Sequence, residues 1–353
     1  MSAHLKTTLL PLRLIAFLAF LLLLQGGWSA HAGNATPATN QSAIRDYRLF
    51  LAMQIDNPVT DSPSSYFTLR RFSRHDSDFV IVVNPHDLSV SIANYNSHVW
   101  LACSWEDFIP LYREMTYGKA ILEARRAVLQ IKDAGFRRFL PSQDGISLTV
   151  DLCPSKRPLD RYFFDTLITA LANEESPVPI GIAITGVWMK NHGKDLAWLL
   201  ELERTNRIRI TWINHSYNHH LLPGRDSTEQ FLRDRNTTLA KEVLGVEQLL
   251  LEQGLMPSVF FRFPGLISNP EMIVRVVSFG LIPVGSDAWL AKEEQPRNGS
   301  IVLVHANGNE PWGLTKFVSF LAEKQDSIKR KAWFLYDLRS SIIKAMDSTS
   351  AVH

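Results

Sequence analysis

The chain has 353 residues, of which 46% are hydrophobic and 20% charged, with a formal net charge of +2 at pH 7. This composition excludes an intrinsically disordered chain, a low-complexity fibre and a multi-span membrane protein. A charge balance so close to zero also gives no electrostatic reason to expect nucleic acid or an anionic membrane as a partner.

Residues 1–32 have the pattern of a secretory signal peptide. Lys6 and Arg13 precede an unbroken apolar run, Leu14 to Leu24, and Ala30-His31-Ala32 follows as a small-x-small cleavage site. A run this short spans only about half of a ~30 Å hydrocarbon core, which disfavours the alternative of a membrane anchor. We therefore expect cleavage before Gly33 and a mature protein that is secreted or periplasmic, with no stable membrane insertion.

The next part of the chain is a tether followed by a small accessory region. Residues 33–41 are polar and without periodicity, which predicts a flexible tether. Residues 42–140 are expected to form a β-rich accessory region with short strands at 66–69, 79–83 and 88–92 and one helix over 117–134. Turn-forming residues at 84–87 predict that the last two strands pair as a hairpin. Three roles are open to this region: covering a cleft, binding glycan, or packing against the main domain.

Residues 141–325 form the predicted main domain, in which apolar β runs alternate with amphipathic helices. Strands are expected over 146–150, 178–184, 208–213, 259–261, 281–284 and 301–304, and helices over 161–173, 194–202, 228–253 and 270–279. Ser227 and Gln230 form a capping-box pattern at the third helix, and Asn269 followed by Pro270 marks the start of the fourth. Repeated βα units predict a parallel sheet, open or closed into a barrel. A C-terminal helix and tail are expected over 326–353.

Two cysteines occur in the chain, Cys103 and Cys153. They lack the CxxC spacing of a zinc finger or a redox pair, and two are too few for a disulfide scaffold. In an oxidising compartment they could form one disulfide, and two buried free thiols are the alternative.

Nearly every predicted strand of the main domain ends in an ionisable or unusual polar group. These groups are Asp151, Thr185, the run from Asn214 to His219, Arg262, Asp287 and His305. The carboxyl ends of parallel strands open on one face of a sheet, where active sites of such proteins are built. The sequence therefore predicts a common pocket.

The residue types at these strand ends indicate metal and proton-transfer chemistry. On a helical turn, the four-residue spacing of His215 and His219 puts both imidazoles on one side, where they can hold one metal ion together with a carboxylate. His305 follows a buried strand and is a candidate general acid or base. Arg262 has apolar neighbours and needs a carboxylate partner, for which Asp151 and Asp287 are the candidates.

Five segments of the main domain also follow one another in a recognisable order. They are Thr149-Val150-Asp151, His215-Ser216-Tyr217-Asn218-His219, Arg262-Phe263-Pro264, Asp287-Ala288-Trp289 and Leu303-Val304-His305. In this order they resemble the five motifs of the NodB-like polysaccharide deacetylases of carbohydrate esterase family 4, over roughly residues 146–320. The resemblance implies a distorted (β/α) barrel that removes N- or O-acetyl groups from a polysaccharide with the help of a divalent metal ion, commonly Zn²⁺.

The resemblance also implies a role for each matched residue. The metal ligands would be His215 and His219. The catalytic residues would be Asp151 as the base that activates water, Arg262 as its orienting partner, His305 as the acid for the leaving amine, and Asp287 as the residue that tunes His305. The substrate-binding residues would be Trp289, as a wall for the acetyl methyl, with Phe263 and Pro264.

One position departs from the family pattern. The first motif of the family usually reads Thr-Phe-Asp-Asp-Gly-Pro, in which the second Asp is a metal ligand, whereas here Leu152 follows Asp151. The alternatives for the third ligand are Asp151 itself, Asp160 and Cys153, and a weakly bound or absent metal is a further one. We predict that Asp151 is primarily the base and that the two histidines hold the metal with water or a weak third ligand.

Three functions are weighed on these grounds. The leading hypothesis is an exported metal-dependent hydrolase acting on an acetylated amino-sugar polysaccharide such as peptidoglycan or an exopolysaccharide. The alternative is a catalytically silent carbohydrate-binding protein on the same barrel. A third hypothesis is a glycoside hydrolase that uses Asp151 and Asp287 as a carboxylate pair about 5 to 9 Å apart, which leaves the two histidines unexplained.

Overall fold

The computed structural model describes residues 43–57, 62–126, 134–171, 175–220 and 238–349. The predicted signal peptide and tether lie outside these ranges, as do Ser227 and Gln230 of the predicted capping box. Ser42–His353 form one compact unit, which includes both the accessory region and the main domain. Within the described ranges, no helix combines the length and apolar character that a membrane crossing requires.

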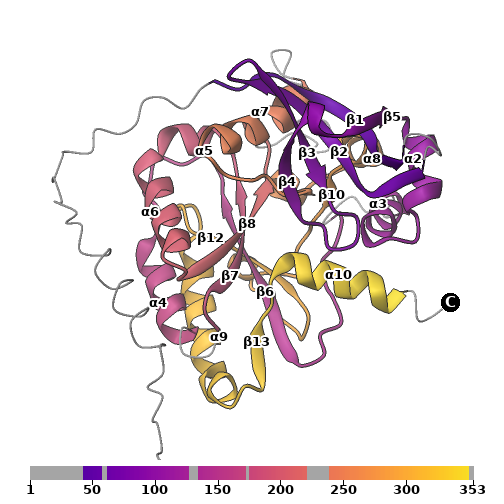
Figure 1. Cartoon of the computed structure of the whole chain (residues 1–353). Helices are drawn as coiled ribbons and strands as arrows, with labels where there is room; N and C mark the ends of the chain where they lie inside the picture. Colours follow the sequence, from indigo (N-terminus) through magenta and orange to yellow (C-terminus); the bar gives the residue numbers. More distant parts are fainter. Residues whose placement is uncertain (1–42, 58–61, 127–133, 172–174, 221–237, 350–353) are drawn as a thin grey trace, which may run out of the picture. The chain divides into compact units, whose positions relative to one another are not determined.

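The main sheet is a curled half-barrel of parallel strands (Figure 1). Its strand order is β10-β9-β8-β7-β6-β12-β11, and β13 pairs with the start of β6. The bounds are β6 Asp144–Leu152, β7 Val178–Ile184, β8 Ile208–Asn214, β9 Phe260–Phe261, β10 Ile282–Pro283, β11 Ala288–Trp289, β12 Ile301–His305 and β13 Trp333–Leu335. The predicted distorted (β/α) barrel is confirmed in this form.

Continuous apolar sequence explains why the central strands are parallel. Every residue of β7 and β12 is buried, as expected for strands that are covered on both faces.

The segment after Gly135 bridges β10 and β12, because Phe136 pairs with Val284 and the carbonyl of Arg137 accepts a hydrogen bond from the Ile301 backbone over 2.8 Å. This segment links the two sides of the half-barrel near the start of β12.

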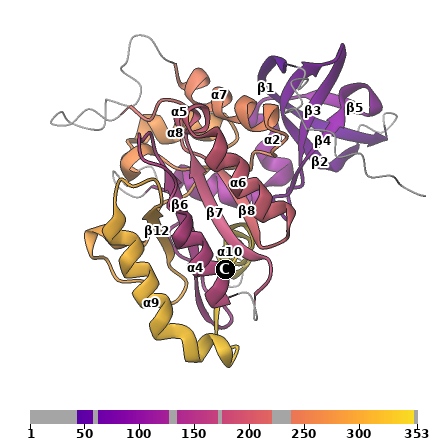
Figure 2. The ribbon, with the colours of Figure 1, turned by 90° about the vertical axis from the view of Figure 1, so that its left-hand side faces the viewer.

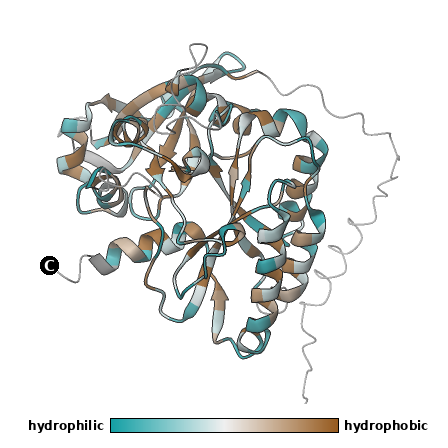
Figure 3. Ribbon diagram, turned by 180° about the vertical axis from the view of Figure 1, so that it is seen from behind, coloured by the Kyte–Doolittle hydropathy of each residue, from teal (hydrophilic) through white to brown (hydrophobic). Residues whose placement is uncertain are grey.

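Seven helices described in the main domain and C-terminal region surround this sheet. They are α4 Arg161–Leu171, α5 Gly186–Asn191, α6 Gly193–Arg204, α7 Leu239–Glu252, α8 Pro270–Ser278, α9 Pro311–Lys329 and α10 Leu338–Thr349. Apolar residues of α4, α6 and α9 share one core with β6, β7 and β12. The positions of these helices and strands can be followed in Figures 1 and 2. The strands carry much of the apolar sequence of this core (Figure 3).

Short polar side chains set the helix starts. Asn269 accepts a hydrogen bond from the Met272 backbone over 2.8 Å, and Pro270 occupies the first position of α8, as predicted. Thr238 caps α7 in the same way and has an extended backbone. The prediction of one helix over residues 228–253 is therefore wrong at Thr238. The extended backbone of this residue interrupts the helical hydrogen bonding, and α7 begins after it.

The accessory region is a five-stranded antiparallel sheet with order β4-β3-β2-β1-β5, followed by two helices. Their bounds are β1 Arg45–Asn57, β2 Ser62–Arg74, β3 Ser77–Val83, β4 Val90–Asn94, β5 Val99–Ala102, α2 Trp105–Tyr112 and α3 Thr116–Arg126. The predicted hairpin is confirmed, because β3 and β4 pair antiparallel with Val83 opposite Val90. Strand β1 was not predicted, since several register shifts break its alternation of polar and apolar residues.

This sheet packs against the main domain through an apolar face and one buried ion pair. Phe67 and Leu69 of β2 share a core with Val243 of α7 and with residues of α8. Beside this core, Arg70 donates to both carboxylate oxygens of Glu247 on α7, over 2.6 and 2.8 Å. Breaking such a pair by removing one partner leaves an uncompensated buried charge. Of the three roles open to the accessory region, packing is the one that these contacts support.

Candidate active site

The register of the parallel strands brings four polar residues to one edge of the sheet. Asp151 of β6 lies directly beside His305, the last residue of β12. The last residue of β8 pairs with the last residue of β9, and the residues that follow them are His215 and Arg262. The predicted common site at the strand ends therefore forms for these four residues.

Arg262 and Asp151 form a buried ion pair. Nη1 of Arg262 donates to Oδ1 of Asp151 and to the hydroxyl of Thr149, each over 2.7 Å, while Nη2 donates to the Gly285 carbonyl over 2.8 Å. Burial by itself would raise the pKa of Asp151. The Arg262 guanidinium and the neighbouring imidazoles lower this pKa by more than burial raises it, so the pKa lies below its ordinary value. Asp151 is therefore ionised at neutral pH and aimed by Arg262.

The turn after β8 presents His215 and His219 without forming a helix. Ser216 and His219 both have left-handed backbones, with φ of 65° and 54°. The Asn214 side chain accepts from the Ser216 backbone over 3.1 Å, and the Ser216 hydroxyl accepts from the His219 backbone over 3.1 Å. The predicted helical turn is wrong here, because these side-chain hydrogen bonds stabilise a tighter, irregular turn. The two imidazoles still meet, with ring centroids 4.7 Å apart.

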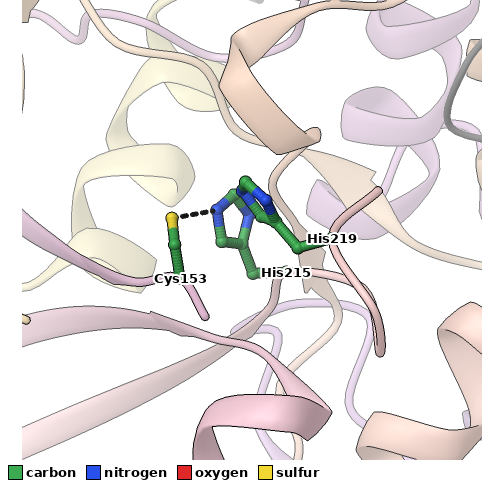
Figure 4. Close-up of side chains that lie close together, drawn as sticks. All are labelled: Cys153, His215 and His219. Carbon is green, nitrogen blue, oxygen red and sulfur yellow. Dashed lines mark hydrogen bonds between the residues drawn. The ribbon is translucent and has the colours of Figure 1, made fainter. Parts of the chain in front are cut away.

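Three donor atoms converge at this turn (Figure 4). Nδ1 of His215 lies 2.9 Å from the Arg262 carbonyl, which can only accept, so Nδ1 carries the hydrogen and Nε2 is left for a ligand. That Nε2 lies 3.5 Å from Sγ of Cys153, and Nε2 of His219 is buried without a hydrogen-bond partner among the described residues. The donor atoms of all three residues lie within 4.8 Å of one another. Two imidazoles and a thiolate fit a divalent cation such as Zn²⁺.

Strand alternation explains why Cys153, and not the residue after Asp151, joins the histidines. Successive side chains of a strand point to opposite faces, so Cys153 shares the face of Asp151 while Leu152 points away into the hydrophobic core, fully buried. Asp160, another alternative for the third ligand, instead caps the start of α4 by accepting from the Phe163 backbone over 3.0 Å. Both cysteines are free thiols, so the predicted disulfide is absent between them; Cys153 is buried, whereas Cys103 is only partly buried.

The protonation states of the donors also suit a cation. Burial lowers the pKa of His219 to about 3 and also lowers that of His215, so both rings are neutral at pH 7, as metal ligands must be. Burial raises the pKa of the Cys153 thiol well above its ordinary value. Binding a cation would therefore displace the thiol proton, which makes affinity rise with pH.

His305 lies between an acidic residue and an indole ring. Its Nδ1 is 2.8 Å from Oε2 of Glu310, and the indole N–H of Trp289 donates to the same oxygen over 2.7 Å. The centroids of the His305 and Trp289 rings are 5.6 Å apart, so the two rings are neighbours. Glu310 was missed from the sequence, because it follows the last motif by five residues in a loop without periodicity.

Asp287 lies at the opposite end of β12 from His305. Its backbone N–H donates to the carbonyl of Ile301, the first residue of the strand, over 2.9 Å. His305 is four residues farther along, which at about 3.3 Å per residue is roughly 13 Å. The prediction that Asp287 tunes His305 is therefore wrong. The same offset separates Asp287 from Asp151, beyond the carboxylate spacing of about 5 to 9 Å that a glycoside hydrolase needs.

The carboxylate of Asp287 instead has a structural environment. It accepts from the Ser300 hydroxyl over 2.7 Å and from Arg297 over 3.0 Å, and it lies 3.4 Å from Nε of Arg138. These contacts tie the start of β12 to the segment that bridges it to β10. Asp287 therefore stabilises the fold rather than the site.

The other two predicted substrate-binding residues lie mainly in the core. The ring of Phe263 is 2% exposed and packs 5.1 Å from that of Phe261. Pro264 is buried and opens the short 3₁₀ helix η4, Pro264–Leu266. The structure thus gives Phe263 a packing role in place of the predicted substrate contact, because no face of its ring is open.

No family model matches the chain. Among solved structures, a family 4 carbohydrate esterase from Bacillus anthracis is 18% identical with a TM-score of 0.44, over 65% of this chain and 92% of that one. Bacillus subtilis PdaA, also a family 4 carbohydrate esterase, is 15% identical with a TM-score of 0.43, over 64% and 88%. A family 4 pseudoenzyme from Bacillus anthracis is 14% identical with a TM-score of 0.41, over 60% and 70%. At TM-scores this low, the assignment of function rests on the side chains of the site.

Proposed function

We propose that the chain is an exported, metal-dependent hydrolase that removes acetyl groups from an acetylated amino-sugar polysaccharide. The observation that carries the proposal is the convergence, at one edge of the sheet, of an ionised Asp151, a Cys153/His215/His219 donor group and His305. A base, a cation site and an acid are the three parts that metal-assisted amide hydrolysis requires.

The residues of the chain divide the proton transfers between them. A divalent cation held by the donor group would polarise the acetyl carbonyl and lower the pKa of the attacking water toward ~7. Oδ2 of Asp151 lies 3.6 Å from Nε2 of His215. Asp151 takes a proton from the water while the water oxygen bonds to the carbonyl carbon. His305 gives a proton to the amine nitrogen as the carbon–nitrogen bond breaks. The ring of Trp289 offers an apolar wall beside His305.

The signal-peptide pattern of residues 1–32 supports the exported location in this proposal. A secreted or periplasmic enzyme meets cell-wall and exopolysaccharide glycans, which carry acetylated amino sugars. The small net charge of +2 is compatible with an uncharged glycan as the partner.

The test is acetate release by the purified chain starting at Gly33. With Zn²⁺ or Co²⁺ present, we expect acetate from chitooligosaccharides or peptidoglycan, and we expect a chelator to abolish it. The Asp151→Asn variant serves as the matched inactive control.

A catalytically silent carbohydrate-binding protein is the alternative, and Leu152 at the usual ligand position favours it. Glycan binding by the metal-loaded chain, without acetate release from either polymer, would support this alternative and overturn the hydrolase. Acetate release by the metal-loaded chain therefore distinguishes the hydrolase from the carbohydrate-binding protein.

A further inference from the structure

Oε2 of Glu310 joins two ring nitrogens of the site. It accepts from the indole N–H of Trp289 over 2.7 Å and lies 2.8 Å from Nδ1 of His305. The contact between Nδ1 and Oε2 is an ion-pair contact whose angles are not those of a hydrogen bond. Nδ1 of His305 therefore has no aligned hydrogen-bond partner among the described residues. An unpartnered buried ring nitrogen is costly, and the Glu310 carboxylate is the acceptor within reach of Nδ1.

The loop between His305 and α9 is built to present Glu310. Asn307 is fully buried, and its side chain donates to the Cys153 carbonyl over 2.7 Å and accepts from the Asn309 backbone over 3.2 Å. Gly308 has a left-handed backbone with φ of 77°, and its carbonyl accepts from Arg157 over 2.7 Å. These contacts fix the loop on both sides, and Glu310 then takes the N-cap position of α9.

We propose that Glu310 positions His305 for proton transfer, the role that the family resemblance assigned to Asp287. The catalytic meaning of this proposal rests on the proposed function, while the contact itself does not. A carboxylate at Nδ1 selects the tautomer with hydrogen on Nδ1, orients the ring and stabilises the imidazolium, so that Nε2 is the atom that gives up a proton. A histidine and a carboxylate in acyl-transfer triads are related in the same way.

Other charged groups also face His305 and must stay constant in any test. Asp151 lies beside it on β6, and the imidazoles of His215 and His219 contribute from the turn after β8. From η5, Leu290–Lys292, the ammonium of Lys292 lies 3.3 Å from the centre of the Trp289 ring. Glu310, by contrast, contacts Nδ1 of His305 directly, at 2.8 Å.

The decisive comparison is between Glu310→Gln and Asp287→Asn, each of which removes one charge with little change of shape. The first readout is the ¹⁵N NMR spectrum of the imidazoles in the full chain without substrate, with His305 assigned by its loss in His305→Asn. We expect Glu310→Gln to change the ¹⁵N chemical shifts of the His305 ring and to mix its two tautomers, because the carboxylate at Nδ1 is lost. Asp287→Asn should leave both unchanged and lower Tm instead.

Kinetics provide the second readout. In Glu310→Gln we expect kcat to fall by about 10- to 100-fold with KM nearly constant, since proton transfer is affected and glycan binding is not. A His305 spectrum that responds to Asp287→Asn, or to neither variant, overturns the proposal even in an active enzyme. The expected spectral change in a chain that releases no acetate would support the contact and overturn the proposed function, so the two failures are distinguishable.

Discussion

Nη1 of Arg262 donates to Oδ1 of Asp151 over 2.7 Å, and neither side chain is more than slightly exposed. The guanidinium is therefore the reason that a carboxylate can stay ionised at this depth, and its further hydrogen bonds to Thr149 and to the Gly285 carbonyl hold it in one orientation. Arg262 thus both keeps the proposed base Asp151 ionised and fixes the orientation of its carboxylate.

Replacing Arg262 by Met should be strongly destabilising, by about 3 to 5 kcal/mol, because Asp151 is left as an unpaired buried anion. Denaturant unfolding at pH 7 measures this loss. The double variant Arg262→Met/Asp151→Asn should recover part of it, since no buried charge then remains. Strictly additive losses in the double variant would contradict the coupling.

The role of Asp151 is tested by Asp151→Asn. We expect deacetylation to be abolished and zinc affinity to change little, because the carboxylate is held by Arg262 beside the donor group rather than within it. A ligand role predicts a site weaker by at least about tenfold. Turnover and zinc affinity measured on this variant separate the two, and a folded but metal-free variant would show that the assigned role is wrong.

Cys153 should be the third ligand of the cation. In the wild-type chain, Co²⁺ should produce a sulfur-to-cobalt charge-transfer absorption in the near ultraviolet, and Cys153→Ser should remove it and weaken zinc binding by about tenfold or more. Cys103→Ser is the matched control, because Cys103 is the other free thiol and belongs to the accessory region. Identical cobalt spectra of wild type and Cys153→Ser would exclude sulfur ligation.

Glu175 should make the fold less stable as pH rises. Burial raises its pKa to about 7, although the Leu335 backbone N–H donates to the carboxylate over 2.8 Å. The folded state therefore binds more protons than the unfolded state between the ordinary pKa and about 7, so stability falls as pH rises through this window. Glu175→Gln should flatten that slope and raise stability at pH 8 by on the order of 1 kcal/mol after solvent screening. Urea unfolding at pH 5 and pH 8 gives the comparison, and an unchanged slope would count against it.

Local sequence determined much of the fold. The apolar run of β7 was predicted at its observed bounds, Val178–Ile184, and α8 was predicted from the cap at Asn269 to within one residue of its end. Both follow from short-range physics, namely the burial of a continuous apolar strand and the pairing of a side chain with free backbone N–H groups. For the same reason, the residues that end the strands could be named as site candidates.

Only the tertiary structure decided which of those candidates meet. The sequence by itself determined that Asp287 and His305 flank strands, but the register between β11 and β12 puts them at opposite ends and leaves Glu310 beside His305. It also determined that Leu152 follows Asp151, whereas the pleat of β6 turns Leu152 into the core and brings Cys153 to the histidines. Register and strand orientation arise from contacts between segments far apart in the chain, which no local pattern of residues encodes.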